Sequence, residues 1–229
     1  YQAILSEAEK EADVIIWDGG NNDLPFYQPD LCITVVDPHR PGHELSYYPG
    51  EVNLRMADAV IINKVDTAKR NDIDTVRNNV NQANPNAEII ECRSPITVTN
   101  PELLKGKRVL VVEDGPTLTH GGMGYGAGFI AARSAGAVMV DPRAMAVGSI
   151  VDTYKKYPHM GPILPAMGYG EQQIKDLSAT IERCDVDVVV IGTPIDLQHL
   201  IELSKPAVRV TYDLADDSGC LEKLIQRFC

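Results

Sequence analysis

The chain has 229 residues, of which 44% are hydrophobic and 23% are charged, and this balance predicts a folded protein with one large or two small domains. A formal net charge of −11 opposes nucleic-acid binding, which requires a surplus of Lys and Arg along the binding face. No apolar run approaches the roughly 20 residues that a bilayer span needs, and the amino terminus lacks the layout of a secretory signal, so we expect no membrane partner and a cytoplasmic location.

The first half of the chain alternates predicted helices with apolar strands rich in Val and Ile. A helical pattern over residues 1–12 runs directly into the first strand, so we expect the chain to begin inside a fold. A helix is expected over residues 70–84, and strands are expected at residues 13–18, 31–37, 59–64 and 87–92. This alternation predicts a parallel sheet with helices on both faces.

The second half repeats the same alternation after a segment with two prolines, residues 94–107. Strands are expected at residues 108–114, 137–140, 162–166, 186–192 and 207–213. Helices are expected at residues 126–135, 143–156, 171–183, 196–203 and at the end of the chain. We therefore predict an α/β protein in which residues 1–100 form part of a P-loop NTPase-like nucleotide-binding domain, lacking its P-loop in this chain. Residues 101–229 are predicted to form a second, Rossmann-like α/β domain with a glycine-rich anion-binding loop.

Asp18 directly follows the first predicted strand and precedes two glycines. Ligands of parallel α/β sheets bind beyond the carboxyl ends of the strands, so polar residues at these positions are candidates for function. An acidic residue at a strand end can hold Mg²⁺ beside nucleotide phosphates, which makes Asp18 the predicted metal ligand and a candidate catalytic residue. The alternative is that Asp18 caps the next turn.

The sequence Asn63-Lys64-Val65-Asp66 follows the strand expected at residues 59–64 and matches the N-K-x-D base-recognition motif of P-loop GTPases. In that motif the Asp accepts hydrogen bonds from guanine and the Lys stem packs along the base. Ser94 follows the next strand, where relatives place a further base-contacting loop. The alternative is a turn whose Asp caps the following helix. The chain contains no G-x-x-x-x-G-K-[ST] sequence, so either that loop lies in a preceding segment or this domain does not hydrolyse nucleotide by itself.

A glycine-rich segment, residues 113–128, joins a predicted strand to a predicted helix. Glycines let the backbone approach a ligand closely, and the start of a helix offers N–H groups to an anion. The residues predicted to bind the substrate or an anion are Thr117, Thr119, His120, Gly121, Gly122, Tyr125 and His39. A flexible turn is the alternative interpretation of this segment.

Arg40 lies in a loop, residues 37–44, that also follows an apolar strand and also contains His39 and His43. The guanidinium of Arg40 and the two imidazoles could clamp a phosphate or a carboxylate. Arg40 is therefore a candidate catalytic residue, together with Asp18 and with His120 of the glycine-rich segment. The alternative is a solvated loop. Metal binding by the two histidines lacks a third ligand at a characteristic spacing.

Six segments together resemble the carboxy-terminal half of the cyclic 2,3-diphosphoglycerate synthetase family. They are WDGGNND, VVDPHRPGHE, INKVD, VEDGPTLTHGGMGYGAG, LPAMGYGEQQIKDL and VIGTPIDL. The resemblance covers essentially all 229 residues, and family members carry an α/β domain and a P-loop before the point where this chain begins. It implies a synthetase that closes 2,3-diphosphoglycerate into its cyclic phosphoanhydride with ATP and Mg²⁺.

The resemblance also implies roles for individual residues. Asp18 would serve Mg²⁺, while Asn63, Lys64 and Asp66 would hold the base. The loop at residues 117–126, with Arg40 and His120, would hold the acceptor. The N-K-x-D motif implies guanine whereas the family reaction uses ATP, so the nucleotide is expected to be ATP or GTP.

Two other classes of function remain open from the residues. One is a GTP-binding switch or metallochaperone-like protein, and the other is a non-catalytic domain that binds a small anion or supports assembly. The expected partners are a nucleotide, a small phosphorylated acid and a second copy of the chain in a homodimer.

Overall fold

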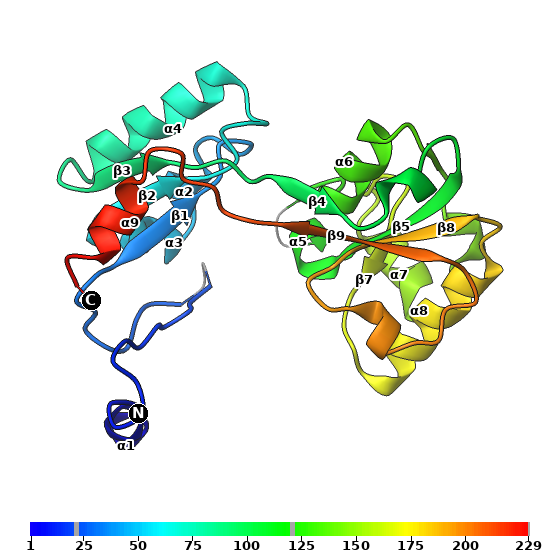
Figure 1. Cartoon of the computed structure of the whole chain (residues 1–229), viewed down its shortest axis with the longest axis horizontal. Coiled ribbons are helices and arrows are strands. Elements are labelled where there is room, and N and C mark those ends of the chain that lie inside the picture. The colour runs from blue at the N-terminus through cyan, green and yellow to red at the C-terminus, as the bar shows by residue number, and fades with distance from the viewer. Residues whose placement is uncertain (21–22, 120–121, 229) are drawn as a thin grey trace. The chain divides into compact units, whose positions relative to one another are not determined.

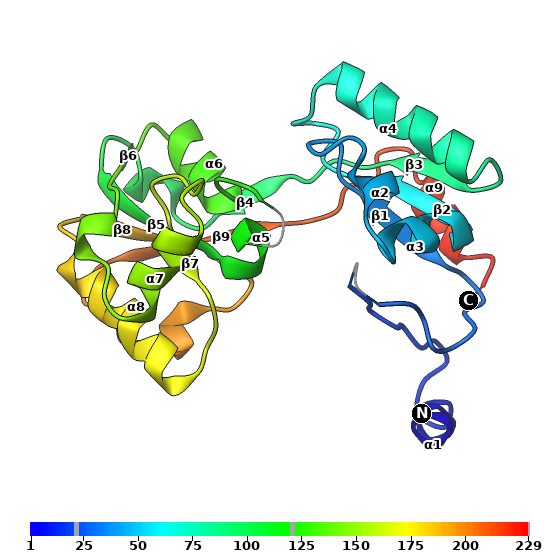
Figure 2. The same cartoon turned by 180° about the vertical axis from the view of Figure 1, so that it is seen from behind.

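The computed structural model describes residues 1–20, 23–119 and 122–228, in which helices and strands alternate along the chain (Figures 1 and 2). The α-helices are α1 (Gln2–Ala8), α2 (His43–Ser46), α3 (Gly50–Met56), α4 (Arg70–Ala83), α5 (Gly115–Thr119), α6 (Ala127–Ser134), α7 (Ser149–Lys156), α8 (Glu171–Arg183) and α9 (Cys220–Ile225). The strands are β1 (Ile33–Val36), β2 (Ala59–Ile62), β3 (Glu88–Glu91), β4 (Ile96–Val98), β5 (Arg108–Asp114), β6 (Val138–Met139), β7 (Leu164–Ala166), β8 (Val188–Gly192) and β9 (Ala207–Tyr212).

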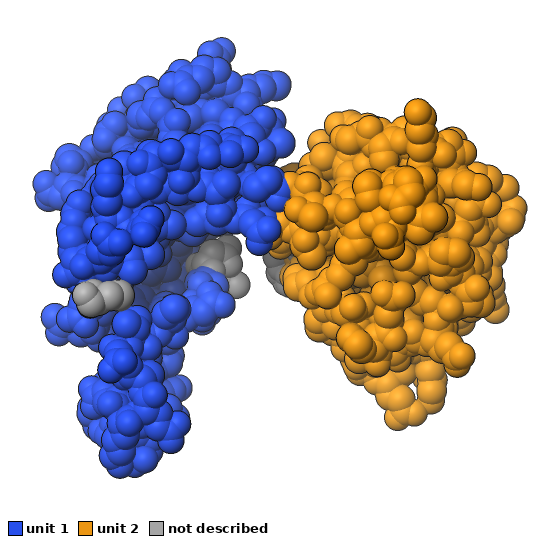
Figure 3. Space-filling model, viewed as in Figure 1, with its two compact units in different colours: residues 1–95, 213–229 blue, residues 96–212 orange. Residues whose placement is uncertain are grey.

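The chain divides into two compact units (Figure 3). Unit 1 contains residues 1–95 and 213–229, and unit 2 contains residues 96–212. The sequence placed residues 213–229 in the second domain, whereas α9 belongs to unit 1. The reason is apolar packing, because Leu224 of α9 is buried in a cluster with side chains of β2 and β3.

Unit 1 is built on a three-stranded sheet in the order β1-β2-β3, and both pairings are parallel, as predicted. All four residues of β2 are buried, which requires cover on both faces of the sheet. Val60 and Ile62 pack with α3 and α4 on one face. Ala59 and Ile61 pack with α9 on the other face. The helix predicted over residues 70–84 is α4, which buries Ile73, Val76 and Val80 at helical spacing.

Residues 13–18 form no strand, so this prediction was wrong. Val14, Ile15 and Ile16 are exposed, and β1 pairs with β2 alone in the described part of the sheet. An apolar run becomes a strand only when its backbone N–H and C=O groups find a partner strand. Asp18 consequently does not lie at the end of a strand in this structure.

Unit 2 is built on a mixed sheet in the order β4-β9-β8-β5-β6, with β7 paired to β5 as well. Strand β5 is parallel to β6, β7 and β8, and β8 is parallel to β9. Strand β4 is antiparallel to β9, so the segment at residues 94–107 contains a sheet edge as well as a boundary. Both views place α6 on one side of β5 and β8, with α7 and α8 on the other side (Figures 1 and 2).

The strand order of unit 2 reverses between β5 and β8. After β5 the chain adds β6 and β7 along one edge of β5, and then returns to form β8 along the other edge. Ligands of open α/β sheets bind beyond the carboxyl ends of the strands at such a reversal. Glu113 of β5 and Gly192 of β8 are paired neighbours at this place.

Two predicted helices of unit 2 are shorter than expected. The segment 143–156 contains a 3₁₀ turn at Arg143–Met145 and then α7, because Gly148 between them has φ 53°. The segment 196–203 forms only a 3₁₀ turn, whose cap is Asp196. Across the described residues no helix combines the length and apolar character that a membrane crossing requires.

Candidate functional site

The three strands of unit 1 end in a row of polar residues. Asp37 follows β1, Asn63 and Lys64 follow β2, and Ser94 comes shortly after β3. Because neighbouring parallel strands end at the same edge of a sheet, three predicted site residues, Asn63, Lys64 and Ser94, lie along one edge together with Asp37.

Lys64 has a left-handed backbone with φ 59°, a conformation that is rare for residues other than glycine. The Asn63 side-chain oxygen accepts the Lys64 N–H at 2.8 Å. The Lys64 carbonyl accepts the N–H groups of Thr67 and Ala68, each at 3.1 Å. These bonds tighten the chain into a turn directly after β2. The turn therefore carries the Lys64 side chain back toward the end of β1.

Asp37 is the centre of a charged cluster in unit 1. Its carboxylate accepts hydrogen bonds from the Lys64 ammonium at 2.8 Å, from the Arg40 guanidinium at 3.1 Å and from the His39 N–H at 3.0 Å. Burial opposes ionisation of Asp37, but the hydrogen bond and charge of Lys64, with smaller contributions from His39 and Arg40, outweigh it and lower the pKa of this carboxyl. Asp37 therefore stays ionised and fixes both cations.

Asp66 and Ser94 connect the two loops that the sequence assigned to the base. The Asp66 carboxylate accepts the backbone N–H of Ser94 at 3.1 Å. Ser94 is buried while Asp66 is exposed, so the carboxylate lies at the surface over the Ser94 loop. The Val65 N–H also donates to the Cys92 carbonyl at 3.1 Å. The structure therefore brings Asn63, Lys64, Asp66 and Ser94 into one connected group.

His39 and Arg40 belong to this same group in unit 1. The His39 Nε2 lies 2.9 Å from the Thr67 hydroxyl, and Arg40 pairs with Asp37. The sequence assigned both residues to the acceptor together with the glycine-rich loop. In the structure their contacts are with the N-K-x-D turn and its neighbour Asp37.

Asp18 is exposed on the irregular segment before β1. Within residues 1–20, 23–119 and 122–228, no three His, Cys, Asp or Glu side chains are arranged to hold a metal ion. Magnesium often needs only one or two carboxylates together with substrate phosphates. The role of Asp18 in binding Mg²⁺ therefore stays a prediction.

The glycine-rich segment of unit 2 contains a short helix, α5, before its loop. Thr117 lies within α5, and the Thr119 hydroxyl donates to the Gly115 carbonyl of the same helix at 3.0 Å. Gly122 is exposed with φ 62°. Tyr125 stacks on Phe129, with ring centroids 4.9 Å apart. The predicted site residues His120 and Gly121 lie outside the described residues.

Glu113, which the sequence analysis did not single out, lies at the reversal between β5 and β8. Its side chain is buried, with 2% of its surface exposed. One carboxylate oxygen accepts the N–H of Gly126 at 3.1 Å and the N–H of Phe129 at 2.8 Å. These N–H groups belong to the start of α6, where the sequence predicted an external anion. The internal carboxylate of Glu113 therefore occupies donors that we had assigned to a ligand.

Burial raises the pKa of Glu113 to about 7, and the charge of Asp114 adds to this effect, while the hydrogen bonds from the backbone of Phe129, Gly126 and Gly128 oppose it. Strongly perturbed pKa values are frequent at functional sites, and they also occur in buried structural networks. The available signal in the sequence was a charged residue near the end of an apolar strand, VLVVE. Its glycine partners are distant in sequence, so the pattern alone did not show them.

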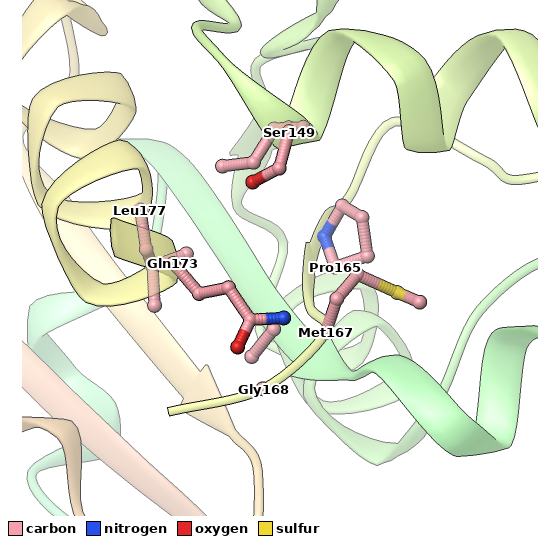
Figure 4. Close-up of a pocket in the computed structure, with 8 residues that line it drawn as sticks. Ser149, Pro165, Met167, Gly168, Gln173 and Leu177 are labelled. Carbon is pink, nitrogen blue, oxygen red and sulfur yellow. The ribbon is translucent and has the colours of Figure 1, made fainter. Parts of the chain in front are cut away.

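A small pocket lies where β7 ends and α7 and α8 begin (Figure 4). Its lining residues are Ser149, Ile150, Pro165, Ala166, Met167, Gly168, Gln173 and Leu177. Two further contacts join this pocket to the ends of β5 and β8. A Cβ on Gly115 would meet the Ala166 carbonyl oxygen at 2.5 Å, and the Tyr169 hydroxyl lies 3.2 Å from the Thr193 hydroxyl. The loops after β5, β7 and β8 therefore converge at one edge of unit 2.

Residues 2–92 match the family model described as the P-loop domain of cyclic 2,3-diphosphoglycerate synthetase. Two proteins named cyclic 2,3-diphosphoglycerate synthetase are also similar to this chain. The protein from Thermococcus sibiricus is 29% identical over 113 residues, which are 48% of this chain and 25% of that protein. The protein from Methanosphaera stadtmanae is 27% identical over 82 residues, which are 35% of this chain and 18% of that protein. The resemblance to the cyclic 2,3-diphosphoglycerate synthetase family is confirmed.

A protein from Thermococcus kodakarensis named arginine synthetase ArcE is much more similar. It is 66% identical over 217 residues, which are 94% of this chain and 48% of that protein. The chain thus spans about half the length of this relative and less of the other two. Residues 2–92 of unit 1 are accordingly similar to a P-loop-type α/β domain, and all three relatives are named as synthetases.

Proposed function

We propose that this protein is a nucleotide-dependent synthetase that forms arginine. The observation that carries the proposal is the 66% identity to the arginine synthetase of Thermococcus kodakarensis over 94% of this chain. The two relatives named for the cyclic diphosphoglycerate reaction are 29% and 27% identical and match shorter segments.

In this proposal unit 1 binds the base of the nucleotide. The Asp66 carboxylate lies exposed over the Ser94 loop, and the Lys64 stem is fixed by its ion pair with Asp37. Fixing both groups before the ligand arrives reduces the side-chain ordering that binding would otherwise require. A carboxylate favours a base with N–H donors on the facing edge, which supports GTP, whereas the family reaction supports ATP.

Unit 2 would bind the substrate at the edge where its three loops converge. The carboxyl end of β5 carries two neighbouring acids, Glu113 and Asp114, and the first N–H groups of α6 are already bonded to Glu113. A phosphorylated substrate would find two of the N–H donors at the start of α6 already bonded to Glu113. An amino acid without phosphates does not need these donors, which supports an arginine-forming reaction.

The chemistry of such a reaction can be written from the product. Arginine differs from the ureido amino acid citrulline by one nitrogen in place of the ureido oxygen. Phosphoryl transfer from the nucleotide to that oxygen would make it a leaving group, and ammonia would then displace phosphate at the same carbon. Catalysis of this type depends chiefly on positioning the reactants and on stabilising charge. Mg²⁺ would neutralise charge on the nucleotide phosphates, with Asp18 as its proposed protein ligand.

A second candidate is the closure of 2,3-diphosphoglycerate into its cyclic phosphoanhydride. It is supported by the match of residues 2–92 to the P-loop domain of that synthetase family. A role for the segment at residues 117–126 in holding the phosphorylated acid belongs to this candidate.

One experiment distinguishes the two reactions. The full-length protein is incubated with Mg²⁺ and ATP or GTP, in one set with citrulline and ammonia and in another with 2,3-diphosphoglycerate. Mass spectrometry then measures arginine, the cyclic product and the nucleoside diphosphate. We expect arginine and nucleoside diphosphate in equal amounts. Formation of the cyclic product without arginine would replace our proposal by the second candidate, and the absence of both products would refute a synthetase of either kind.

A further inference from the structure

Three glycines surround the buried side chain of Glu113. A Cβ placed on Gly126 would lie 2.5 Å from its Oε2, and one on Gly192 would lie 2.6 Å from the same atom. A Cβ on Gly128 would lie 3.3 Å from Oε1. Real Cβ atoms do not approach other atoms within 3 Å, so two of these positions accept only glycine while the carboxylate stays in place.

The carboxylate joins elements that are distant in sequence. Glu113 lies at the end of β5, Gly192 at the end of β8, and Gly126 and Phe129 at the start of α6. A negative charge at the first turn of a helix is stabilised by the helix dipole and by N–H groups that have no partner within the helix. Glu113 therefore ties the loop before α6 to the point where the strand order reverses.

No basic side chain of the described elements faces Glu113. The charge that acts on it most is that of its neighbour Asp114, which disfavours ionisation. On α6, Arg133 lies in the last turn and packs over the Phe129 ring. The strand β8, with sequence VVVIG, has no titratable side chain. On the preceding loop Tyr125 is exposed and stacks on Phe129. Ionisation of Glu113 is therefore supported by backbone N–H groups and opposed by burial.

We propose that Glu113 is a positioning residue for the reaction of this protein, and that its ionised carboxylate holds the loop before α6 against the carboxyl ends of β5 and β8. Hydrogen bonds to an ionised acceptor are about twice as strong as neutral ones, so protonation weakens the two hydrogen bonds that Glu113 accepts from Gly126 and Phe129. The inference rests on the synthetase function proposed above, with unit 2 as the part that binds the substrate. Beyond the synthetase activity, it assigns a role to Glu113 and a pH dependence to the reaction.

The first test is the pH profile of kcat/KM for the full-length protein, with the product identified in the experiment above. The wild-type value should rise as the pH increases through the pKa of Glu113, which is about 7, and then reach a plateau. Glu113→Gln retains an oxygen acceptor but cannot titrate, so its profile should lack this rise. Glu113→Asp should retain the rise with a lower plateau, because a shorter carboxylate reaches the N–H groups less well.

Asp187→Asn is the matched control. The Asp187 carboxylate accepts the Arg108 N–H at 2.9 Å, and thus bonds to the backbone at the opposite end of β5. This variant should show the wild-type profile. A wild-type rise that persists in Glu113→Gln would overturn the link between Glu113 and the reaction.

Amide hydrogen exchange gives a second readout that does not depend on activity. The N–H groups of Gly126 and Phe129 should exchange at least about tenfold faster in Glu113→Ala than in wild type, since the loss of a charged acceptor removes at least one strong hydrogen bond. The core strand β8 should stay protected, which would show that the variant is folded. Unchanged exchange at both amides would overturn the positioning role. If wild type formed neither arginine nor the cyclic product, the proposed function would fail, and the exchange result would still decide the attachment of the loop.

Discussion

The buried carboxyl of Glu113 should make the stability of unit 2 depend on pH in a direction opposite to that of most carboxylates. Its pKa is raised from 4.5 to about 7 because the folded state disfavours the charged form. The folded state therefore binds this proton more tightly than the unfolded chain does. The stabilisation is complete below about pH 4.5 and is lost progressively as the pH rises to about 7, above which it changes no further.

The size of the effect follows from the shift of the pKa. A difference of about 2.5 units at about 1.4 kcal/mol per unit gives about 3.5 kcal/mol of unfolding free energy lost between pH 4.5 and about 7. Glu113→Gln is neutral at every pH, so it should lack this loss. Thermal melts of both proteins across this range measure the difference, and subtraction removes the contribution of other titrating groups.

The expected difference curve has a definite sign. Relative to Glu113→Gln, wild type should become less stable by about 3.5 kcal/mol as the pH rises, which corresponds to a fall in melting temperature on the order of 10 °C for a unit of this size. A flat difference would mean that Glu113 titrates normally. A difference of the opposite sign would mean that a cation stabilises the ionised carboxylate, and either result would refute the reasoning.

Three further predictions concern single residues. Asp66→Asn should weaken GTP binding to the full-length protein by about 1–3 kcal/mol in calorimetry and leave ATP binding nearly unchanged. Asp30→Asn, an exposed control in unit 1, should affect neither nucleotide. If the wild type prefers ATP and Asp66→Asn does not change this preference, the assignment of guanine to Asp66 is wrong. Asp37→Asn should reduce the loss of stability that unit 1 suffers at low pH. The lowered pKa of Asp37 gives stability that is present above its ordinary value of 3.8 and is lost as the pH falls through the pKa of the folded state. Equal loss of stability of both proteins in melts at low pH would contradict this. Gly126→Ala should lower the melting temperature of unit 2, because its Cβ would lie 2.5 Å from Glu113 Oε2, and the double variant with Glu113→Ala should recover part of the loss.

Local patterns predicted those parts of the fold in which an apolar run pairs with a neighbouring strand. The run AVII became β2, buried on both faces, and the helix expected over residues 70–84 became α4. The run VIIW, equally apolar, formed no strand, and it pairs with no strand of the described sheet. Apolar character therefore indicated a tendency, while pairing decided the structure.

The candidate site was predictable to the extent that its residues are neighbours in sequence. The turn at Asn63 and Lys64 was found because its motif is contiguous and follows a clear strand. Asp66 and Ser94 were both assigned to base-contacting loops after neighbouring strands, and the structure adds the contact between them. The surroundings of Glu113 are formed by residues from β5, β8 and α6, and only the fold brings these together. The spacing of residues in the sequence could therefore not predict the surroundings of Glu113.

The distribution of charge gives a physical reason to separate the roles of the two units. In a chain with a net charge of −11, Lys64 and Arg40 gather around one carboxylate at the strand ends of unit 1, next to the proposed base loop. The strand end of unit 2 instead carries Glu113 and Asp114. The N–H groups of Gly126 and Phe129 at the start of α6, which could have attracted a phosphate, are bonded to Glu113. Local charge outweighs net charge at short range because salt screens interactions beyond about 10 Å. This distribution of charge is the reason why we propose that the nucleotide binds at the edge of unit 1 and an amino-acid substrate without phosphates at the edge of unit 2.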